Sequence, residues 1–526
     1  MKRTTQEWKQ ELKEFQEQTK AFYGGELDKG SYKSISGYYG SYAQRSGDAG
    51  MLRLRMTAGR VTKERMAFTA RMLREYPVQR IHFTTCQTIQ LHDLHPDAIA
   101  RISEEALDAG IITIGGGGDY PRNVMCSPLA GVDPEEYFDV LPYAEAASEY
   151  LLGLIGTAKL PRKLKVGFSS SPANRTHATF RDLGFAARPD GKFDVYSAGG
   201  LGNRPMMGVL IAEAVDPAEV CTYCQAMWLT FLAHGNYQNR GKARSRFMQE
   251  SLGGPEQYRE AFLEMLAKVQ NGAPQPGTEA GLRISVKEWA EKQEGACKQG
   301  DGSAAEGRRV LAQKQEGLYA VLWHPVGGQP NLNVFQAVNA AVQSIEGAEL
   351  RLTPDQGAWI INLTGAEAEQ MLKLTAADSA RSQFERSVAC IGASTCQIGV
   401  GDSQALLRAC VEAVREAGIP DGALPQIHIS GCPSSCGTHQ IGRLGFRGGM
   451  KRADGEMCPA FTLYAGGCDV QGRESMGREI GTMLARDIPE FLVKLGQEAA
   501  QSGMEYGTWE NEHPERLEEI AKAYLK

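Results

Sequence analysis

Stretches in which apolar and cationic residues alternate predict strands with one charged face. The segment GMLRLRM places Arg53 and Arg55 on one side of a strand, with leucines on the other. The segment LPRKLKV places Lys163 and Lys165 in the same relation to Leu164. A basic strand is often only a solvated edge. Two such strands, together with an arginine at position 122 beside a proline, favour a site for an anion.

The order of these patterns occurs twice along the chain. The motif LGF at 183–185, followed by FDVYSAGG, returns as LGF at 444–446, followed by FTLYAGG. A strand–helix–strand arrangement that begins near residue 50 returns after residue 317. We therefore predict an internally duplicated α+β fold with the order A-B-linker-A′-B′.

Composition and charge limit the kind of partner. The 526 residues suggest three or four domains, and 42% hydrophobic with 23% charged residues is typical of a globular protein. The net charge of −6 gives no overall basic field for nucleic acid. An anionic ligand must therefore meet a local group of cations.

The N-terminal segment is polar and lacks the apolar core of a signal peptide. No apolar run reaches the roughly 18 residues of a membrane span. We expect a cytoplasmic protein that binds no membrane. Its twelve cysteines are then thiols or metal ligands rather than disulfides, because the cytosol is reducing.

Four cysteines form two closely spaced pairs. Cys390 and Cys396 are separated by five residues, and Cys432 and Cys436 by three, within SGCPSSCG. Four cysteines in two pairs can ligate a four-iron, four-sulfur cluster, and the Gly and Ser neighbours let backbone N–H groups approach the sulfurs. Zinc is the alternative, although these spacings are unusual for zinc.

A third pair, Cys221 and Cys224, has the C-x-x-C spacing on a predicted helix. Its neighbours Trp228, Leu229 and Phe231 are apolar, which predicts buried thiols, and a redox-active dithiol is the alternative.

The two cysteine pairs resemble the cluster motif of siroheme-containing sulfite and nitrite reductases, ferredoxin-type and assimilatory-like. The resemblance runs from about residue 50 to 470 and covers the duplication and the linker. It implies ferredoxin-like half-domains plus siroheme- and cluster-binding α+β domains. The implied division is an N-terminal helical extension at 1–50, paired half-domains at 51–118 and 315–380, a siroheme and substrate domain at 119–271, a linker at 272–314, and a cluster and siroheme domain with C-terminal helices at 381–526.

The resemblance also implies roles for individual residues. It places the substrate-binding, catalytic cations at Arg53, Arg122, Lys163 and Lys165. It places the siroheme neighbours at Arg55, Gln87, Gln90, His92, Arg240 and Lys242. It assigns the iron cluster to Cys390, Cys396, Cys432 and Cys436, and makes Cys436 also a ligand of the siroheme iron.

One position departs from the family pattern. The segment TTCQTIQ has Cys86 where the family usually has an arginine that helps to hold siroheme carboxylates. Lys165 stands where sulfite reductases tend to have lysine and plant-type nitrite reductases asparagine. The resemblance thus implies six-electron reduction of sulfite to sulfide, or of nitrite to ammonia, with a slight lean to sulfite.

The source of electrons and two other function classes complete the interpretation. No G-x-G-x-x-G motif follows a predicted strand, so we expect a ferredoxin or a similar carrier to deliver the electrons. The alternatives are a cobalamin-pathway oxygenase of related fold and a non-catalytic electron-transfer protein. Neither needs four cations around a small anion.

Overall fold

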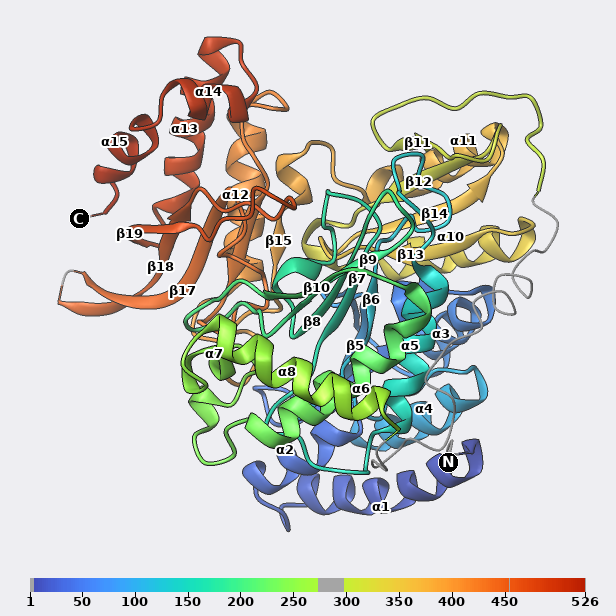
Figure 1. The fold of residues 1–526 in the computed structure, drawn as a ribbon. Helices are drawn as coiled ribbons and strands as arrows, with labels where there is room; N and C mark the ends of the chain where they lie inside the picture. Colours follow the sequence, from blue (N-terminus) through green and yellow to red (C-terminus); the bar gives the residue numbers. More distant parts are fainter. Residues whose placement is uncertain (1–3, 273–297, 454, 526) are drawn as a thin grey trace.

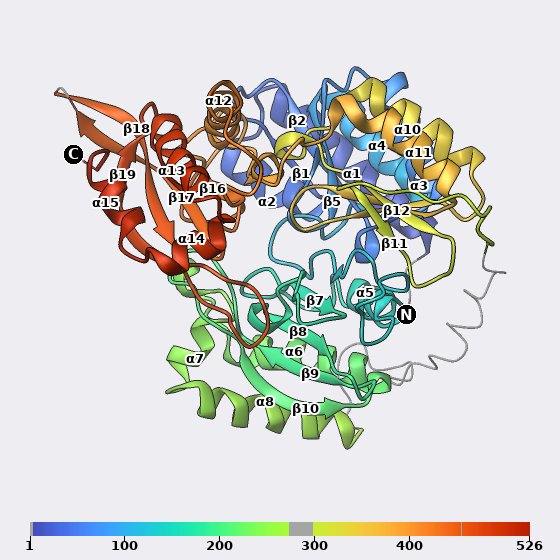
Figure 2. The same cartoon turned by 90° about the horizontal axis from the view of Figure 1, so that it is seen from above.

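The computed structural model describes residues 4–272, 298–453 and 455–525. The middle of the predicted linker lies outside the described residues. Figures 1 and 2 show three lobes around a common centre. We call residues 4–118 and 298–380 the paired lobe, 119–272 the middle lobe, and 381–525 the cysteine lobe. Among the described residues, no helix combines the length and apolar character needed to cross a membrane.

The paired lobe contains two ferredoxin-like halves that share a strand. The first sheet has the order β1 (Ser41–Ala43), β2 (Gly50–Arg55), β5 (Thr88–Leu94), β4 (Arg80–Phe83). The second has the order β11 (Val310–Ala312), β12 (Tyr319–Trp323), β14 (Ala358–Leu363), β13 (Glu349–Leu352), β3 (Arg60–Val61). Because β3 comes from the first half and pairs with β13 of the second, the two halves interlock.

Helices follow the strands of both halves at matching places, and side chains cap them. The helices of the paired lobe are α1 (Thr5–Tyr23), α2 (Lys29–Tyr38), α3 (Lys63–Glu75), α4 (Pro96–Asp108), α10 (Leu332–Ser344) and α11 (Gly365–Thr375). Thr62 caps α3, and Asn331 caps its counterpart α10 by accepting backbone N–H bonds. Thr364 and Glu367 form a capping box at α11.

The middle and cysteine lobes repeat one sheet design, as the recurring LGF motifs predicted. The middle sheet has the order β10 (Val209–Val215), β9 (Phe193–Ser197), β8 (Leu183–Ala187), β7 (Val166–Ser169), β6 (Met125–Cys126). The cysteine-lobe sheet has the order β15 (Val388–Ala389), β16 (Ile427–Ser430), β17 (Leu444–Ala453), β18 (Glu456–Ala465), β19 (Arg478–Leu484). In each sheet a parallel pair joins the LGF strand to the strand before it. The predicted duplication is therefore confirmed.

Helices cover these sheets. Those of the middle lobe are α5 (Leu141–Gly153), α6 (Val220–His234), α7 (Phe247–Ser251) and α8 (Pro255–Gln270), and those of the cysteine lobe are α12 (Ser403–Glu416), α13 (Ile488–Ser502), α14 (Tyr506–Glu512) and α15 (Arg516–Lys522). Helix α6 is buried along nearly its whole length and carries Cys221 and Cys224. Burial raises the pKa of Cys221 to about 12, which makes this thiol unreactive.

The glycine of each LGF motif lies where no side chain fits. A Cβ at Gly184 would meet the carbonyl oxygen of Ala178 at 1.7 Å, and one at Gly445 would meet that of His439 at 1.9 Å. Both glycines stand on strands that pass over the preceding turn. The repeat therefore conserves a close backbone approach as well as a sequence motif.

This approach predicts a specific loss of stability. Gly184→Ala and Gly445→Ala should each lower the apparent melting temperature by roughly 5–10 °C, because backbone must move to admit the methyl group. Gly449→Ala on the same strand as Gly445 is the matched control, since a Cβ there meets no atom within 4 Å. Thermal unfolding of the three variants, followed by circular dichroism, checks this. Equal shifts in all three would contradict it.

Candidate functional site

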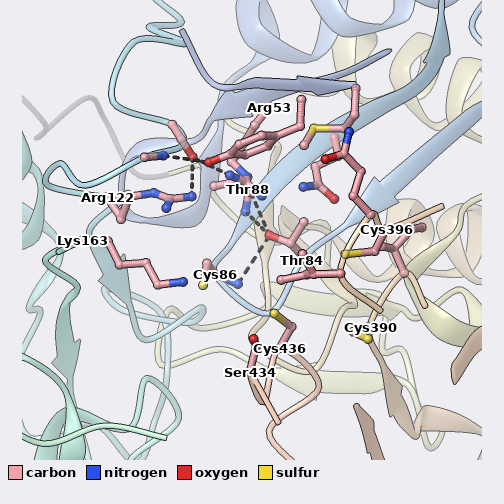
Figure 3. Close-up of a pocket in the computed structure, with 18 of the residues that line it drawn as sticks. Arg53, Thr84, Cys86, Thr88, Arg122, Lys163, Cys390, Cys396, Ser434 and Cys436 are labelled. Carbon is pink, nitrogen blue, oxygen red and sulfur yellow. Dashed lines mark hydrogen bonds between the residues drawn. The ribbon is translucent and has the colours of Figure 1, made fainter. Parts of the chain in front are cut away.

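The three lobes enclose one large cavity, of about 1050 Å³. Its wall brings together the two groups of residues that the sequence singled out, the cations and the paired cysteines. Figure 3 shows Arg53, Arg122 and Lys163 toward one side of it and Cys390, Cys396 and Cys436 toward the other. The lining cations predicted for the substrate are Arg53, Arg122, Lys163 and Lys165, and the lining cysteines of the two pairs are Cys390, Cys396, Cys432 and Cys436.

Two arginines from separate elements meet at a glycine loop. Arg53 on β2 and Arg122 both donate to the carbonyl oxygen of Gly116. The loop is fixed in turn, because the Gly118 N–H donates to the hydroxyl of Tyr42 at 2.8 Å. Burial and the neighbouring Arg53 lower the pKa of Arg122 to about 10. A bound anion would relieve the repulsion between these two guanidinium groups.

Arg55, two residues along the same strand face, organises the wall. It donates to the carbonyl oxygens of Ile114 at 3.2 Å, Pro121 at 3.0 Å and Arg122 at 3.0 Å. Burial, with the nearby Arg122, lowers its pKa to about 9. Arg55 therefore positions the segment that carries Arg122, and it also lines the cavity.

The two lysines lie on an extended segment just before β7. The predicted strand begins later than expected, because Leu164 pairs only through a single bridge to Pro121 and β7 starts at Val166. Alternation nevertheless holds: Leu164 and Val166 are buried, and Lys163 and Lys165 line the cavity. Burial, and then the adjacent Lys165, lower the pKa of Lys163 well below its usual range.

The cysteine pairs meet because their loops follow neighbouring strands. Strands β15 and β16 run parallel, with Ala389 opposite Ile429, so their carboxyl ends lie at the same edge of the sheet. Cys390 follows the first strand, and Cys432 and Cys436 lie in the loop after the second. The Cys390 sulfur accepts the Gly431 N–H at 3.1 Å. These glycine-rich loops thus supply the backbone donors that sulfur ligands require.

The donor set fits a cluster of several irons. Within the described residues, no group of three or more His, Cys, Asp or Glu is arranged to hold a single metal ion. A four-iron cluster takes one thiolate on each iron, so its sulfurs need not converge on one point. Burial and Cys436 raise the pKa of Cys390 to about 12, and burial, with Cys436 and Cys432, raises that of Cys396. Bound iron would remove this repulsion between thiolates.

The expected siroheme neighbours divide into two groups. Gln90, His92 and Arg240 line the cavity. Gln87 does not, because its backbone φ of 52° turns it inward, where it donates to the carbonyl oxygens of Cys126 and Leu352 at 2.8 and 2.7 Å. Lys242 lies on a second, smaller pocket and pairs with Glu250 at 3.2 Å.

Several lining residues were missed by the sequence interpretation. His82 on β4 lies opposite Gln90 on β5 and lines the cavity. Burial, with the nearby Arg80 and Arg53, lowers its pKa to about 3, so the ring is neutral. Tyr42 also lines the cavity, and Arg45 donates to the Cys396 carbonyl oxygen at 3.1 Å. The pairing of IHFTT with TIQLHD across a tight turn was the available signal for His82.

Comparison with known proteins gives consistent matches. The model described as "Nitrite/Sulfite reductase ferredoxin-like half domain" matches residues 42–109. The model described as "Nitrite and sulphite reductase 4Fe-4S domain" matches residues 117–269. This match covers the middle lobe, the first copy of the repeated sheet, whereas the paired cysteines lie in the second copy.

Individual relatives extend over most of the chain. Ferredoxin–nitrite reductase of Synechococcus elongatus is 27% identical over 461 residues, covering 85% of each chain. Sulfite reductase [ferredoxin] 1 of Mycolicibacterium paratuberculosis is 23% identical, covering 87% of this chain and 81% of the relative. The solved structure of the Mycobacterium tuberculosis NirA protein superposes with a TM-score of 0.73 at 22% identity, covering 92% of this chain and 91% of that one, which establishes the shared fold.

Fold and cavity together define a duplicated α+β protein built to hold a redox cofactor between cations and cysteines. The chain belongs to the nitrite and sulfite reductase family. Siroheme and a 4Fe-4S cluster are the cofactors of this family, and the cationic wall and the paired cysteines fit them.

Proposed function

We propose that this chain reduces sulfite to sulfide or nitrite to ammonia by six electrons. One observation carries the proposal: the four predicted anion-binding cations and the four paired cysteines line the same cavity. A siroheme held there, with a 4Fe-4S cluster on Cys390, Cys396, Cys432 and Cys436, would supply the electrons one at a time.

The residues of the chain would have separate tasks. Arg53 and Arg122, tied to one carbonyl, would bind the oxygens of the anion in a site shielded from solvent, where charge interactions are strong. Lys163 would both attract the anion and release a proton, since burial makes its ammonium group more acidic. Cys436 would ligate the siroheme iron as well as the cluster.

Within this function we propose a slight lean to sulfite. Sulfite carries up to two negative charges near neutral pH and nitrite one, so a second lysine beside Lys163 favours sulfite. Lys165 lines the same wall and provides that second ammonium group. Its ammonium group also donates to the neighbouring Cys86 thiol at 3.2 Å.

The test is direct. The purified protein, reconstituted with siroheme and iron where needed, should show siroheme absorption and release sulfide from sulfite or ammonia from nitrite with a reduced dye as donor. The ratio of kcat/KM for the two anions measures the lean. Siroheme-loaded protein that reduces neither anion would contradict the proposed function. A kcat/KM ratio that favours nitrite would contradict only the proposed preference for sulfite.

We further propose a small reduced ferredoxin, or a similar carrier, as the physiological donor, in the cytoplasm. Docking would use a local basic patch despite the net charge of −6. The ferredoxin-driven rate should therefore fall as salt rises, because exposed charges are screened beyond about 8–10 Å at physiological ionic strength. Turnover with the reduced dye is the control for effects of salt on the site itself. A ferredoxin-driven rate that ignores ionic strength would exclude electrostatic docking.

A further inference from the structure

A thiol and an ammonium group are in contact inside the cavity. The Lys165 Nζ donates to the Cys86 Sγ at 3.2 Å, and both residues line the wall. Cys86 is held in place by its own backbone, because Asn123 donates to its carbonyl oxygen at 3.1 Å and its N–H reaches the Thr84 hydroxyl at 3.4 Å. The contact is therefore between two fixed segments, the β4–β5 turn and the extended segment before β7.

The surroundings favour the charged form of this thiol. Burial raises the pKa of Cys86, but Lys165, Arg181 and Arg122 oppose burial and lower it to about 6. Cys86 raises the pKa of Lys165, whereas burial and Arg181 lower it overall. With two further arginines nearby to stabilise a thiolate, we assign the proton to the lysine, which makes the contact an ion pair.

We propose that Cys86 determines specificity: as a thiolate it neutralises Lys165 toward the substrate and so restrains the preference for sulfite over nitrite. The inference rests on the proposed function. One negative charge at this position opposes a dianion about twice as strongly as a monoanion, since the Coulomb energy scales with the charge of the ligand. Lys165 then keeps its hydrogen bonds but attracts a dianion less strongly than an unpaired ammonium group would, so that only a slight lean to sulfite is left.

The test separates the charge of Cys86 from its size. Cys86→Ser keeps a small polar group beside Lys165 but removes the negative charge. It should raise the ratio of sulfite to nitrite kcat/KM by roughly tenfold. The dissociation constants of both anions, measured from the siroheme absorption of the oxidised protein, should show the same change in preference, with sulfite binding gaining more than nitrite binding. Cys458→Ser, on β18 and outside the cavity lining, is the control. It should leave the kcat/KM ratio and the two dissociation constants unchanged.

A second substitution shows whether Cys86 acts through Lys165. Lys165→Asn in the Cys86→Ser background should abolish the gain in sulfite preference, whereas Lys165→Asn alone should change the ratio much less. A Cys86→Ser ratio within about twofold of the unchanged protein would overturn the proposal. So would a gain of the same size with and without Lys165.

The outcome is distinguishable from failure of the proposed function. Loss of turnover on both anions in the unchanged, siroheme-loaded protein would overturn the function, while the dissociation constants would still report on Cys86. The pair itself has an independent readout in peptide-resolved alkylation of the protein before siroheme is added. The pH midpoint for Cys86 should lie near 6 and rise in Lys165→Asn. A midpoint that does not move would overturn the ion pair.

Discussion

Replacing Cys432 by serine is expected to remove the iron cluster and reduce activity on both anions to background. Within the described residues, the loops after β15 and β16 contain no cysteine besides the two pairs, so no other thiolate is at hand to replace Cys432 on iron. Ligation also contributes to folding, so the variant should unfold at a lower temperature. Iron content, cluster absorption and thermal unfolding measure these effects.

The matched control for this prediction is Cys458→Ser. Cys458 lies on β18 and outside the cavity lining, and its side chain is also partly exposed. Iron content and activity should be unchanged there. Full iron content with unchanged activity in Cys432→Ser would show that this cysteine is no ligand.

Lys163→Met is expected to lower kcat/KM for both sulfite and nitrite by roughly 10–100-fold. A charge-assisted hydrogen bond contributes roughly 1.5–3 kcal/mol, and about 1.4 kcal/mol corresponds to a factor of ten. Lys163 points into the cavity (Figure 3), and the described residues supply no hydrogen-bond acceptor for its ammonium group in the structure. The substitution keeps the length of the side chain and removes its charge.

Lys159→Met tests whether the loss is specific to the inner position. Lys159 lines the same cavity but is exposed at its rim. Lys159→Met should change kcat/KM far less than Lys163→Met, when the activities of both variants are normalised to bound siroheme. Equal losses in the two variants would assign Lys163 to general attraction of anions rather than to contact with the substrate.

Most of the residues that the sequence predicted for the site line one cavity, because their side-chain directions follow from local patterns. Alternation places Arg53 and Arg55, and likewise Lys163 and Lys165, on one face of an extended segment, and all four line the cavity. Their side-chain direction follows from the period of two, even where the second segment makes only one bridge. The cysteine spacing is equally local, since each pair lies in a single loop.

Predictions for the turn between β4 and β5 were less complete, because alternation does not apply there. Gln87 has a φ of 52°, so its side chain leaves the cavity and ties Cys126 to Leu352 instead. Gln90 and His92, back on a regular strand, line the cavity as expected. Lys242 likewise lies in an irregular segment, where a contact with Glu250 fixes its direction.

The sequence alone determined the duplicated α+β plan, the cationic strand faces and the two closely spaced pairs of cysteines, since each depends on the periodicity or spacing of nearby residues. Only the tertiary structure decided that β3 completes the other half's sheet, that His82 joins the cavity wall, and that Cys86 meets Lys165. Two of these features join segments far apart in the chain, β3 with β13 and Cys86 with Lys165. The first contact depends on how the two halves of the paired lobe interlock, and the second on how the paired and middle lobes pack together, which no local pattern encodes.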